Sequence, residues 1–379
     1  MLDDAVATQN TVTQIIAAVR VVIREVPGAA EVAAVQCTAH DYTDPGKPRI
    51  AWNDEQARAD LVDALVGDAL RLLGHLPDQQ LGEKAANAVG LLALVAGQDV
   101  EPAEESDGRD GRWRITRGTA HDRMVSTVDP EARHVHKTRT HRQDGFKAHL
   151  AVEPETGLYT AVALRPGAGT EHHEATVGID LLADEDTPVD AFGDTAYSTD
   201  DARQTLQHAG HRLFLKPAPL KTAVVGGFDL DDFAIDTAGS TVTCPAGHTA
   251  NLSEPSGRHM QRKALFTDQC TGCPVRERCT TAKTGRTVNI RPHHDLLAAA
   301  RRQAATDPDR QAAYRRWRPP VERAVAWLVA HGNRRLRYRG TIKNNTGLHT
   351  RAAALNLRTL INLGLTRTSG TWRLTPATA

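Results

Sequence analysis

An acidic residue inside a dense field of arginines is the first chemical signal in this chain. Glu322 lies within the stretch Tyr314–Gly340, in which basic and aromatic residues are interleaved. Four closely spaced arginines follow the acid: Arg334, Arg335, Arg337 and Arg339. Guanidinium groups bind phosphate oxygens through paired hydrogen bonds, so this run is typical of a nucleic-acid contact. The alternatives are a solvated surface, or a dock for the acidic N-terminal half of the chain.

The element that must position Glu322 is a helix. Pro319 and Pro320 fit a helix start, and the apolar residues that follow recur at helical spacing as far as about His331. At about 100° per residue, Glu322 falls at the edge of the apolar stripe, which predicts an inward-facing acid. The simpler interpretation is an acid that interacts with the helix dipole and pairs with Arg318, four residues earlier.

A second acid is predicted to end a strand. Residues 188–193 are strand-like, residues 200–208 are helical and residues 212–216 form another strand, so the segment is a β-α-β unit. Asp194 follows the first strand, and ligands of open α/β sheets bind outside the carboxyl ends of strands. The alternative is a turn aspartate whose carboxylate bonds nearby backbone amides.

Four of the five cysteines lie close together in sequence. They have the pattern C-x25-C-x2-C-x5-C: Cys244, Cys270, Cys273 and Cys279. Tetrahedral zinc takes four thiolate or imidazole ligands, and a C-x2-C pair supplies two from one turn, so the pattern predicts Zn²⁺. An iron–sulfur cluster or uncoordinated thiols are alternatives, and His248 could replace Cys244. Cys37 lies in an apolar stretch and is predicted to be a core residue.

Charge is distributed unevenly along the 379 residues, although the formal net charge is zero. From residue 301 onward there are sixteen basic and three acidic residues, so the remainder carries a matching negative excess. A basic segment favours double-stranded DNA as a partner, while a pI near 7.3 argues against a DNA-coating protein. No signal peptide and no apolar run of about 18 residues is present, which predicts a soluble, cytoplasmic protein without membrane contact.

The remaining elements follow from periodicity. Helices are predicted over residues 2–25, 54–75, 81–97 and 174–183, with Asn53 as the cap of the second. Residues 100–114 lack an apolar period and are predicted to be a linker or a mobile loop. Alternating apolar residues on both sides of the turn 154–157 predict a β-hairpin.

The order of these features resembles a known family. The resemblance rests on four segments: the hairpin DGFKAHLAVEPETGLYTAVALRPGAG, the strand end AFGDTAYST, the cysteine-rich insertion, and an R-x3-E-R helix followed by RRLRYRG. Together they resemble insertion-sequence DDE transposases. The resemblance covers most of the chain and implies an α/β fold: a ribonuclease-H-like mixed sheet with flanking helices, a helical N-terminal region and a small cysteine-rich insertion before the Glu helix.

The resemblance also implies roles for particular residues. Asp194 and Glu322 would be the second and third acids of a catalytic triad and would bind Mg²⁺ in a two-metal site. Arg318 and Tyr314 would belong to the signature around Glu322, which adds Arg318 to the predicted DNA-binding arginines. Family members often place two residues between that tyrosine and arginine, whereas three intervene here.

The first acid of the triad has no clear counterpart. Asp3 and Asp4 precede a predicted helix rather than ending a strand, and Asp41 lies in a polar loop. We therefore expect the chain to be truncated at its N-terminus and its two-metal site to be incomplete. Such a site should bind Mg²⁺ weakly and cleave slowly or not at all.

Four regions are predicted in chain order. They are a helical region (1–112), the first part of the ribonuclease-H-like core (113–217), the cysteine-rich insertion (218–290), and the Glu helix with a basic tail (291–379). The predicted function is a bacterial insertion-sequence transposase that binds the element ends, with a homodimer on DNA as one option, and that cleaves and transfers DNA strands with Mg²⁺. The alternatives are a non-catalytic DNA-binding fragment that regulates an intact transposase, and a metal-dependent nuclease.

Overall fold

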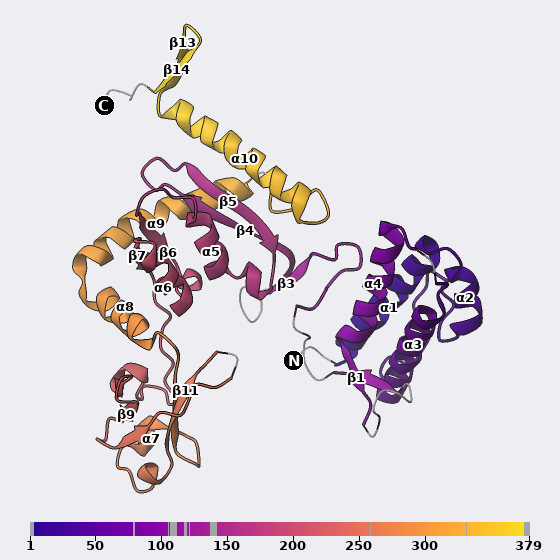
Figure 1. Ribbon diagram of the computed structural model, residues 1–379, viewed down its shortest axis with the longest axis horizontal. Helices are drawn as coiled ribbons and strands as arrows, with labels where there is room; N and C mark the ends of the chain where they lie inside the picture. Colours follow the sequence, from indigo (N-terminus) through magenta and orange to yellow (C-terminus); the bar gives the residue numbers. More distant parts are fainter. Residues whose placement is uncertain are drawn as a thin grey trace. The chain divides into compact units, whose positions relative to one another are not determined.

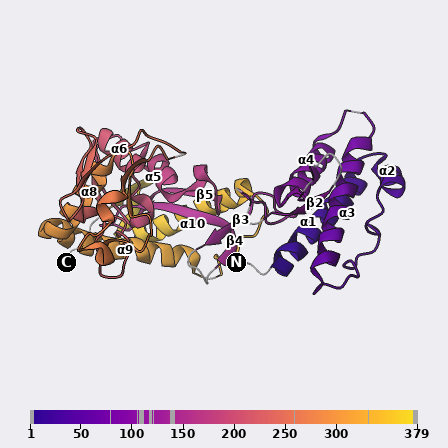
Figure 2. The same cartoon turned by 90° about the horizontal axis from the view of Figure 1, so that it is seen from below.

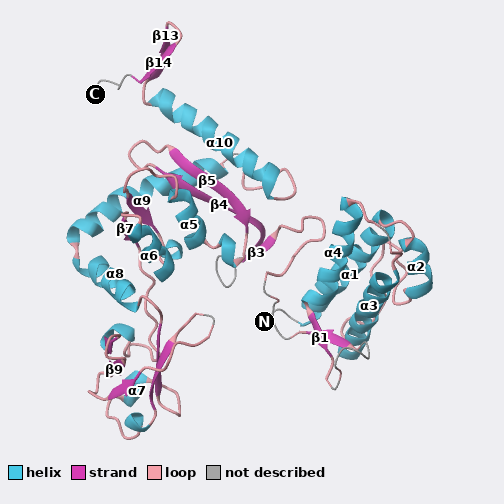
Figure 3. Ribbon diagram, in the orientation of Figure 1, coloured by secondary structure: helices cyan, strands magenta, loops and turns pink. Residues whose placement is uncertain are grey.

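The protein is a mixed α/β chain built from helices and several small sheets (Figure 3). The computed structural model describes residues 4–78, 80–104, 106, 112–116, 120, 122–136, 142–257, 259–330 and 332–374. Two compact units account for the chain. Unit 1 contains residues 1–148, 164–172 and 335–348, and unit 2 contains residues 149–163, 173–334 and 349–379.

Four helices form the bulk of unit 1: α1 (Asp4–Glu25), α2 (Ala29–Gln36), α3 (Glu55–His75) and α4 (Glu83–Gln98). Figure 2 shows α1, α3 and α4 side by side, and fully buried side chains such as Val19, Leu65 and Leu92 fill the space between them. The helices predicted from periodicity are therefore confirmed. Helix α2 was not predicted, because half of its eight residues are alanine, which favours a helix without producing a clear apolar period.

Two local predictions in unit 1 were wrong. Asp54, not Asn53, caps α3, because its carboxylate accepts hydrogen bonds from the amides of Gln56 and Ala57. The segment predicted as a linker contains two paired strands, β1 (Val100–Pro102) and β2 (Trp113–Ile115). Strands of three residues are too short to show a period, which explains the error.

A buried carboxylate ties the loop after α2 to α3. Asp68 is fully buried and accepts hydrogen bonds from the backbone amides of Thr38 (3.0 Å) and Ala39 (2.8 Å) and from the Tyr42 hydroxyl (2.9 Å). Arg71 pairs with the same carboxylate at 2.6 Å. Burial, reinforced by the charge of Asp68, raises the pKa of Tyr42, so this hydroxyl stays protonated as a donor.

The predicted hairpin is present as β4 (Arg142–Val152) and β5 (Tyr159–Pro166), with β3 (Arg133–His136) on the other side of β4. The predicted β-α-β unit is also present. It comprises β6 (Asp190–Gly193), α6 (Asp200–His208) and β7 (Arg212–Leu215), with α5 (Glu174–Leu182) before it. Strands β6 and β7 pair in parallel, so both carboxyl ends lie at the same edge.

The cysteine-rich segment forms two small antiparallel sheets. One has the order β10-β9-β8, and the other pairs β11 with β12. The bounds are β8 (Ala234–Asp236), β9 (Thr241–Thr243), β10 (Thr249–Asn251), β11 (Arg262–Phe266), α7 (Arg276–Cys279) and β12 (Arg286–Ile290). Phe266, Val242 and Val288 are buried between them and form a core of their own.

Three helices and a terminal ribbon complete the chain (Figure 1). They are α8 (His294–Thr306), α9 (Pro308–Val329), α10 (Thr341–Asn362), β13 (Leu365–Thr368) and β14 (Thr371–Leu374). The helix with Glu322 begins at Pro308, where Asp307 caps it, and runs through Pro319 and Pro320. The prediction of a helix start at these prolines was therefore wrong.

Two asparagines of α10 bond the edge strand β5. Asn345 accepts from the amide of Leu164, and Asn356 bonds both the amide and the carbonyl of Tyr159. Eleven helical residues rise about 16 Å, and five strand residues span about the same length, so the two asparagines match the two strand positions. The polar backbone of an edge strand is thereby partly satisfied by side chains.

Substitution of Asp68 tests how much its buried carboxylate stabilises unit 1. Asp68→Ala should lower the free energy of unfolding by about 2–4 kcal/mol, because it leaves buried donors without their acceptor. The exposed Asp78→Ala serves as the control and should change it by less than about 0.5 kcal/mol. Denaturant titration measures both variants. Equal midpoints for the two would contradict the role assigned to Asp68.

Candidate active site and cysteine cluster

Asp194 stands at the carboxyl end of β6, where the sequence placed it. Its carboxylate caps the short 3-10 turn Thr195–Tyr197 by accepting a hydrogen bond from the amide of Ala196 at 2.9 Å. One oxygen thus fixes the local backbone. The side chain is 48% exposed, so the carboxylate remains open to solvent.

One arginine connects this acid to Glu322. Nη2 of Arg318 lies 3.6 Å from Oδ2 of Asp194 and 3.8 Å from Oε1 of Glu322. Because both distances start from the same nitrogen, the two carboxylate oxygens are at most 7.4 Å apart (3.6 Å plus 3.8 Å), a separation that two bridged metal ions can span. The structure therefore brings together two acids that are 128 positions apart in the sequence.

The orientation of Glu322 differs from the prediction. Its side chain is 67% exposed, whereas the periodicity predicted an inward-facing acid. The buried positions of α9 are Ala324 and Leu328, and Glu322 lies off their stripe. The predicted apolar stripe included Val325, which is 44% exposed, and at about 100° per residue Glu322 lies closer to Val325 than to Ala324 or Leu328.

Hydrogen bonds from two other elements hold α9 in place. The hydroxyl of Tyr159 donates to the carbonyl of Ala324 at 2.6 Å, and Asn356 holds the backbone of the same tyrosine. At the end of α9, Arg351 donates to the carbonyl of Leu328 at 2.7 Å. A cation at this position stabilises the last turn of a helix, so the helix with Glu322 is fixed at its centre and its end.

Tyr197, which was not predicted to belong to the site, lies in the short turn that Asp194 caps. Tyr197 lies so close to the backbone of Gly178 that a β-carbon there would overlap its ring, while a β-carbon at Gly193 would overlap the side chain of Leu215. Burial, together with the charges of Asp194 and Glu174, raises the pKa of Tyr197 to about 12. The Gly-Asp-x-x-Tyr spacing was the available signal.

A buried arginine fixes the neighbouring strand end. Arg203 of α6 is 2% exposed and donates to the Ser198 hydroxyl (2.9 Å) and to the carbonyl of Leu215 (2.8 Å). Burial and the nearby Arg310 lower the pKa of Arg203 to about 10, which still leaves it charged near neutral pH. One buried side chain thus connects the carboxyl end of β7 to the end of the short turn that follows Asp194.

The four predicted DNA-binding arginines that follow α9 lie on the surface. Arg334, Arg335, Arg337 and Arg339 are all exposed, and no ion pair with an acid is recorded for them within the described part of the chain. Within unit 1, Asn344 bonds the backbone of Tyr338 and Gly340 and shapes this loop. The four guanidinium groups are therefore accessible to an anionic partner.

Two acids outside the predicted site anchor the same loop. Both carboxylate oxygens of Asp129 accept from the amide of Gly340 at 3.2 Å, and Glu131 accepts from the amide of Thr341 at 2.9 Å. Both lie at the N-terminus of α10, where a negative charge is favourable. The two acids flank Pro130 in the sequence, and their contact with this loop was not predicted.

Among the described residues, no third acid forms a metal-binding group with Asp194 and Glu322. Asp41 is exposed and its carboxylate bonds Thr43 in a local turn, which holds its pKa below the usual range. Asp3 lies outside the described residues, as does the side chain of Asp4. Where the structure describes the chain, no group of three or more His, Cys, Asp or Glu side chains could hold a metal ion.

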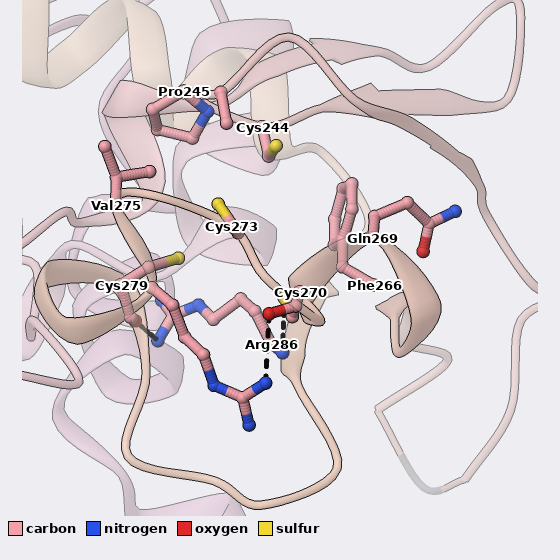
Figure 4. A pocket seen from close by; sticks show the side chains of 11 residues that line it. Cys244, Pro245, Phe266, Gln269, Cys270, Cys273, Val275, Cys279 and Arg286 are labelled. Carbon is pink, nitrogen blue, oxygen red and sulfur yellow. Dashed lines mark hydrogen bonds between the residues drawn. The ribbon is translucent and has the colours of Figure 1, made fainter.

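The four clustered cysteines line one small pocket (Figure 4). Cys270 and Cys279 are buried, and Cys244 and Cys273 are half-buried. The amide of Arg286 donates to Sγ of Cys270 at 3.4 Å. Burial raises the pKa of Cys279, and the other three thiols add to the rise, so the four sulfurs share one electrostatic environment.

Only part of this arrangement fits a zinc site. The exposed His248 does not line the pocket, whereas Cys244 does. The backbone carbonyl of His248 accepts a hydrogen bond from the amide of Cys244. Cys244 rather than His248 is therefore the fourth member of the cluster. The donor set suits Zn²⁺. The sulfurs nevertheless do not form a group that could hold a metal ion as they stand, so the zinc prediction is not supported by this geometry.

None of the helices described in the structure is long and apolar enough to cross a membrane. No curated protein and no solved structure matches the chain. Two family models do match, and each is described as a transposase DDE domain. One covers residues 113–225, which include Asp194, and the other covers residues 243–361, which include the cysteines and Glu322. The chain is a member of the DDE-type transposases.

Proposed function

We propose that this protein binds double-stranded DNA at the ends of a mobile element and cleaves and transfers strands by Mg²⁺-dependent phosphodiester chemistry. The observation that carries the proposal is the convergence of Asp194 and Glu322 on one guanidinium nitrogen. Two matches to transposase DDE domains that together span most of the chain support it.

The acids fit a site for Mg²⁺ in chemical type. Arg318 already places one positive charge within 4 Å of both carboxylates, so a cation at this point has two anionic neighbours. Magnesium is commonly held by one or two carboxylates together with waters and substrate phosphates. When bound, it would polarise the phosphodiester and favour ionisation of the attacking water or hydroxyl. Asp194 and Glu322 are the residues that would hold it.

The arginines have a separate task in this proposal. Arg334, Arg335, Arg337 and Arg339 contact DNA phosphates and position the duplex, while Arg318 lies near enough to the acids to contact the phosphate that reacts. The parallel pair β6–β7, the antiparallel sheet β3-β4-β5 and the helices α5, α6 and α9 are the parts from which a ribonuclease-H-like core would be built.

A second function has one observation in its favour. Because no third acid approaches the pair among the residues that the structure describes, the chain could bind DNA without cutting it and so regulate an active transposase. A DNA-binding regulator needs the arginines and not the acids. Experiments on the two groups of residues therefore separate the two functions.

Substitution of the acids tests the catalytic proposal. Asp194→Asn and Glu322→Gln should each reduce Mg²⁺-dependent cleavage of a duplex by at least about 100-fold, because each removes an anionic ligand. Unfolding should shift by less than about 0.5 kcal/mol, since both side chains are substantially exposed. The exposed Asp186→Asn is the matched control and should cleave like the wild type. Wild-type protein that binds DNA but shows no cleavage would favour the regulator.

Substitution of the loop arginines tests the DNA contact. Affinity for duplex DNA should fall steeply with salt, because each neutralised phosphate releases counterions. Replacing Arg334, Arg335, Arg337 and Arg339 with alanine should reduce the salt slope by up to about 3–4 units. Lys47→Ala/Arg49→Ala removes two exposed charges from the acidic half and should leave the slope unchanged. A slope that stays the same in the fourfold variant would place the DNA elsewhere.

Metal analysis tests the cysteine cluster, whose donor chemistry favours Zn²⁺ although its sulfurs do not form a metal-binding group as they stand. If the cluster rearranges to bind zinc, the purified chain should contain about one equivalent, and Cys273→Ser should lower the content and loosen residues 240–285. Cys37→Ser, outside the cluster, should keep the zinc. Protein without zinc whose cluster thiols react freely with a thiol reagent would exclude the site.

A further inference from the structure

The C-terminal ribbon is an exposed hairpin with a well-defined turn. Strands β13 and β14 pair antiparallel, with Arg367 opposite Trp372 and Thr366 opposite Arg373. The two-residue turn places Ser369 (φ 51°) and Gly370 (φ 83°) in the left-handed region. This is the type I′ geometry that matches the natural twist of two strands. Figure 1 shows the ribbon following the end of α10.

The two faces of the ribbon differ in chemistry. One face carries Arg367 over the ring of Trp372 together with two leucines, and the other carries Arg373 with three threonines. Seven of the eight strand residues are exposed, and Trp372 is 58% exposed. An isolated two-stranded hairpin is marginal in water. The ribbon therefore has the features of an element that is completed by a partner.

The positive charge of the C-terminal segment indicates an anionic partner for the ribbon. After Glu322 the sequence contains no acidic residue, but it contains nine arginines and one lysine. Arg351 and Arg358 of α10 are engaged within unit 2, by the end of α9 and by the ring of Trp327. Arg367 and Arg373, by contrast, have no ion pair among the described residues. A second copy of this ribbon would bring like charges together, whereas a polyanion would neutralise them.

We propose that the β13–β14 ribbon is a DNA-binding element that lies in a groove of the duplex. A two-stranded ribbon fits the width of the major groove. Arg373 and the threonines supply donors to phosphates and base edges, and Arg367 is held over Trp372 as a second cation. This inference rests on the proposed function, because it extends the DNA contact beyond the loop arginines.

Binding of a labelled random-sequence duplex of about 30 base pairs, measured by fluorescence anisotropy across a NaCl series, tests the ribbon. The full chain with Arg367→Gln/Arg373→Gln should bind several-fold more weakly, with a salt slope lower by about 1–2 units. A chain that ends at Gly364 should show the same loss or a larger one, with its thermal unfolding unchanged because the ribbon buries little. Lys47→Gln/Arg49→Gln removes the same charge from exposed positions and should bind like the wild type.

Equal affinity and slope for the wild type, the double variant and the shortened chain would overturn the ribbon contact while leaving the proposed function intact. Wild-type protein that does not bind the duplex would overturn both. Sedimentation in the absence of DNA supplies the remaining outcome. A wild-type dimer that the shortened chain loses, with unchanged DNA binding, would assign the ribbon to a second copy of the chain instead.

Discussion

The candidate site is organised around one guanidinium that lies within 4 Å of two carboxylates. Asp194 ends a strand and Glu322 lies on a helix more than a hundred residues later, and without a cation between them their charges would repel. The protein supports this contact with rigid neighbours on both sides. Arg203 bonds the end of β7 and Ser198 after the turn that Asp194 caps, and Tyr159 and Arg351 bond carbonyls of α9. The acids meet because these polar contacts fix the elements that carry them.

The sequence predicted those parts of the fold in which a local pattern determines the structure. The hairpin β4–β5, the β-α-β unit around Asp194 and three helices of unit 1 follow from alternation or helical period, and all are present. The short strands β1 and β2 and the alanine-rich α2 carry too little pattern to be recognised. The prediction that Asp194 ends a strand needed only local information.

Helix α9 shows where local rules fail. Two adjacent prolines normally begin a helix, because their missing amides would have no partner in the first turn. In α9 they lie in the interior and remove two backbone hydrogen bonds. The Tyr159 hydroxyl and the Arg351 cap contribute bonds to the following turns, and these come from residues that no local pattern connects to α9.

The distances from Arg318 to the two acids show what kind of contact this side chain makes. Distances of 3.6 and 3.8 Å exceed those of a charged hydrogen bond, so Arg318 attracts the acids mainly through its charge. At partly exposed positions such a pair contributes about 1 kcal/mol or less. In the proposed function, a divalent cation held by Asp194 and Glu322 would take over this charge neutralisation through direct carboxylate ligands. Arg318 would then be available to a substrate phosphate, which matches the planar fork of a guanidinium group.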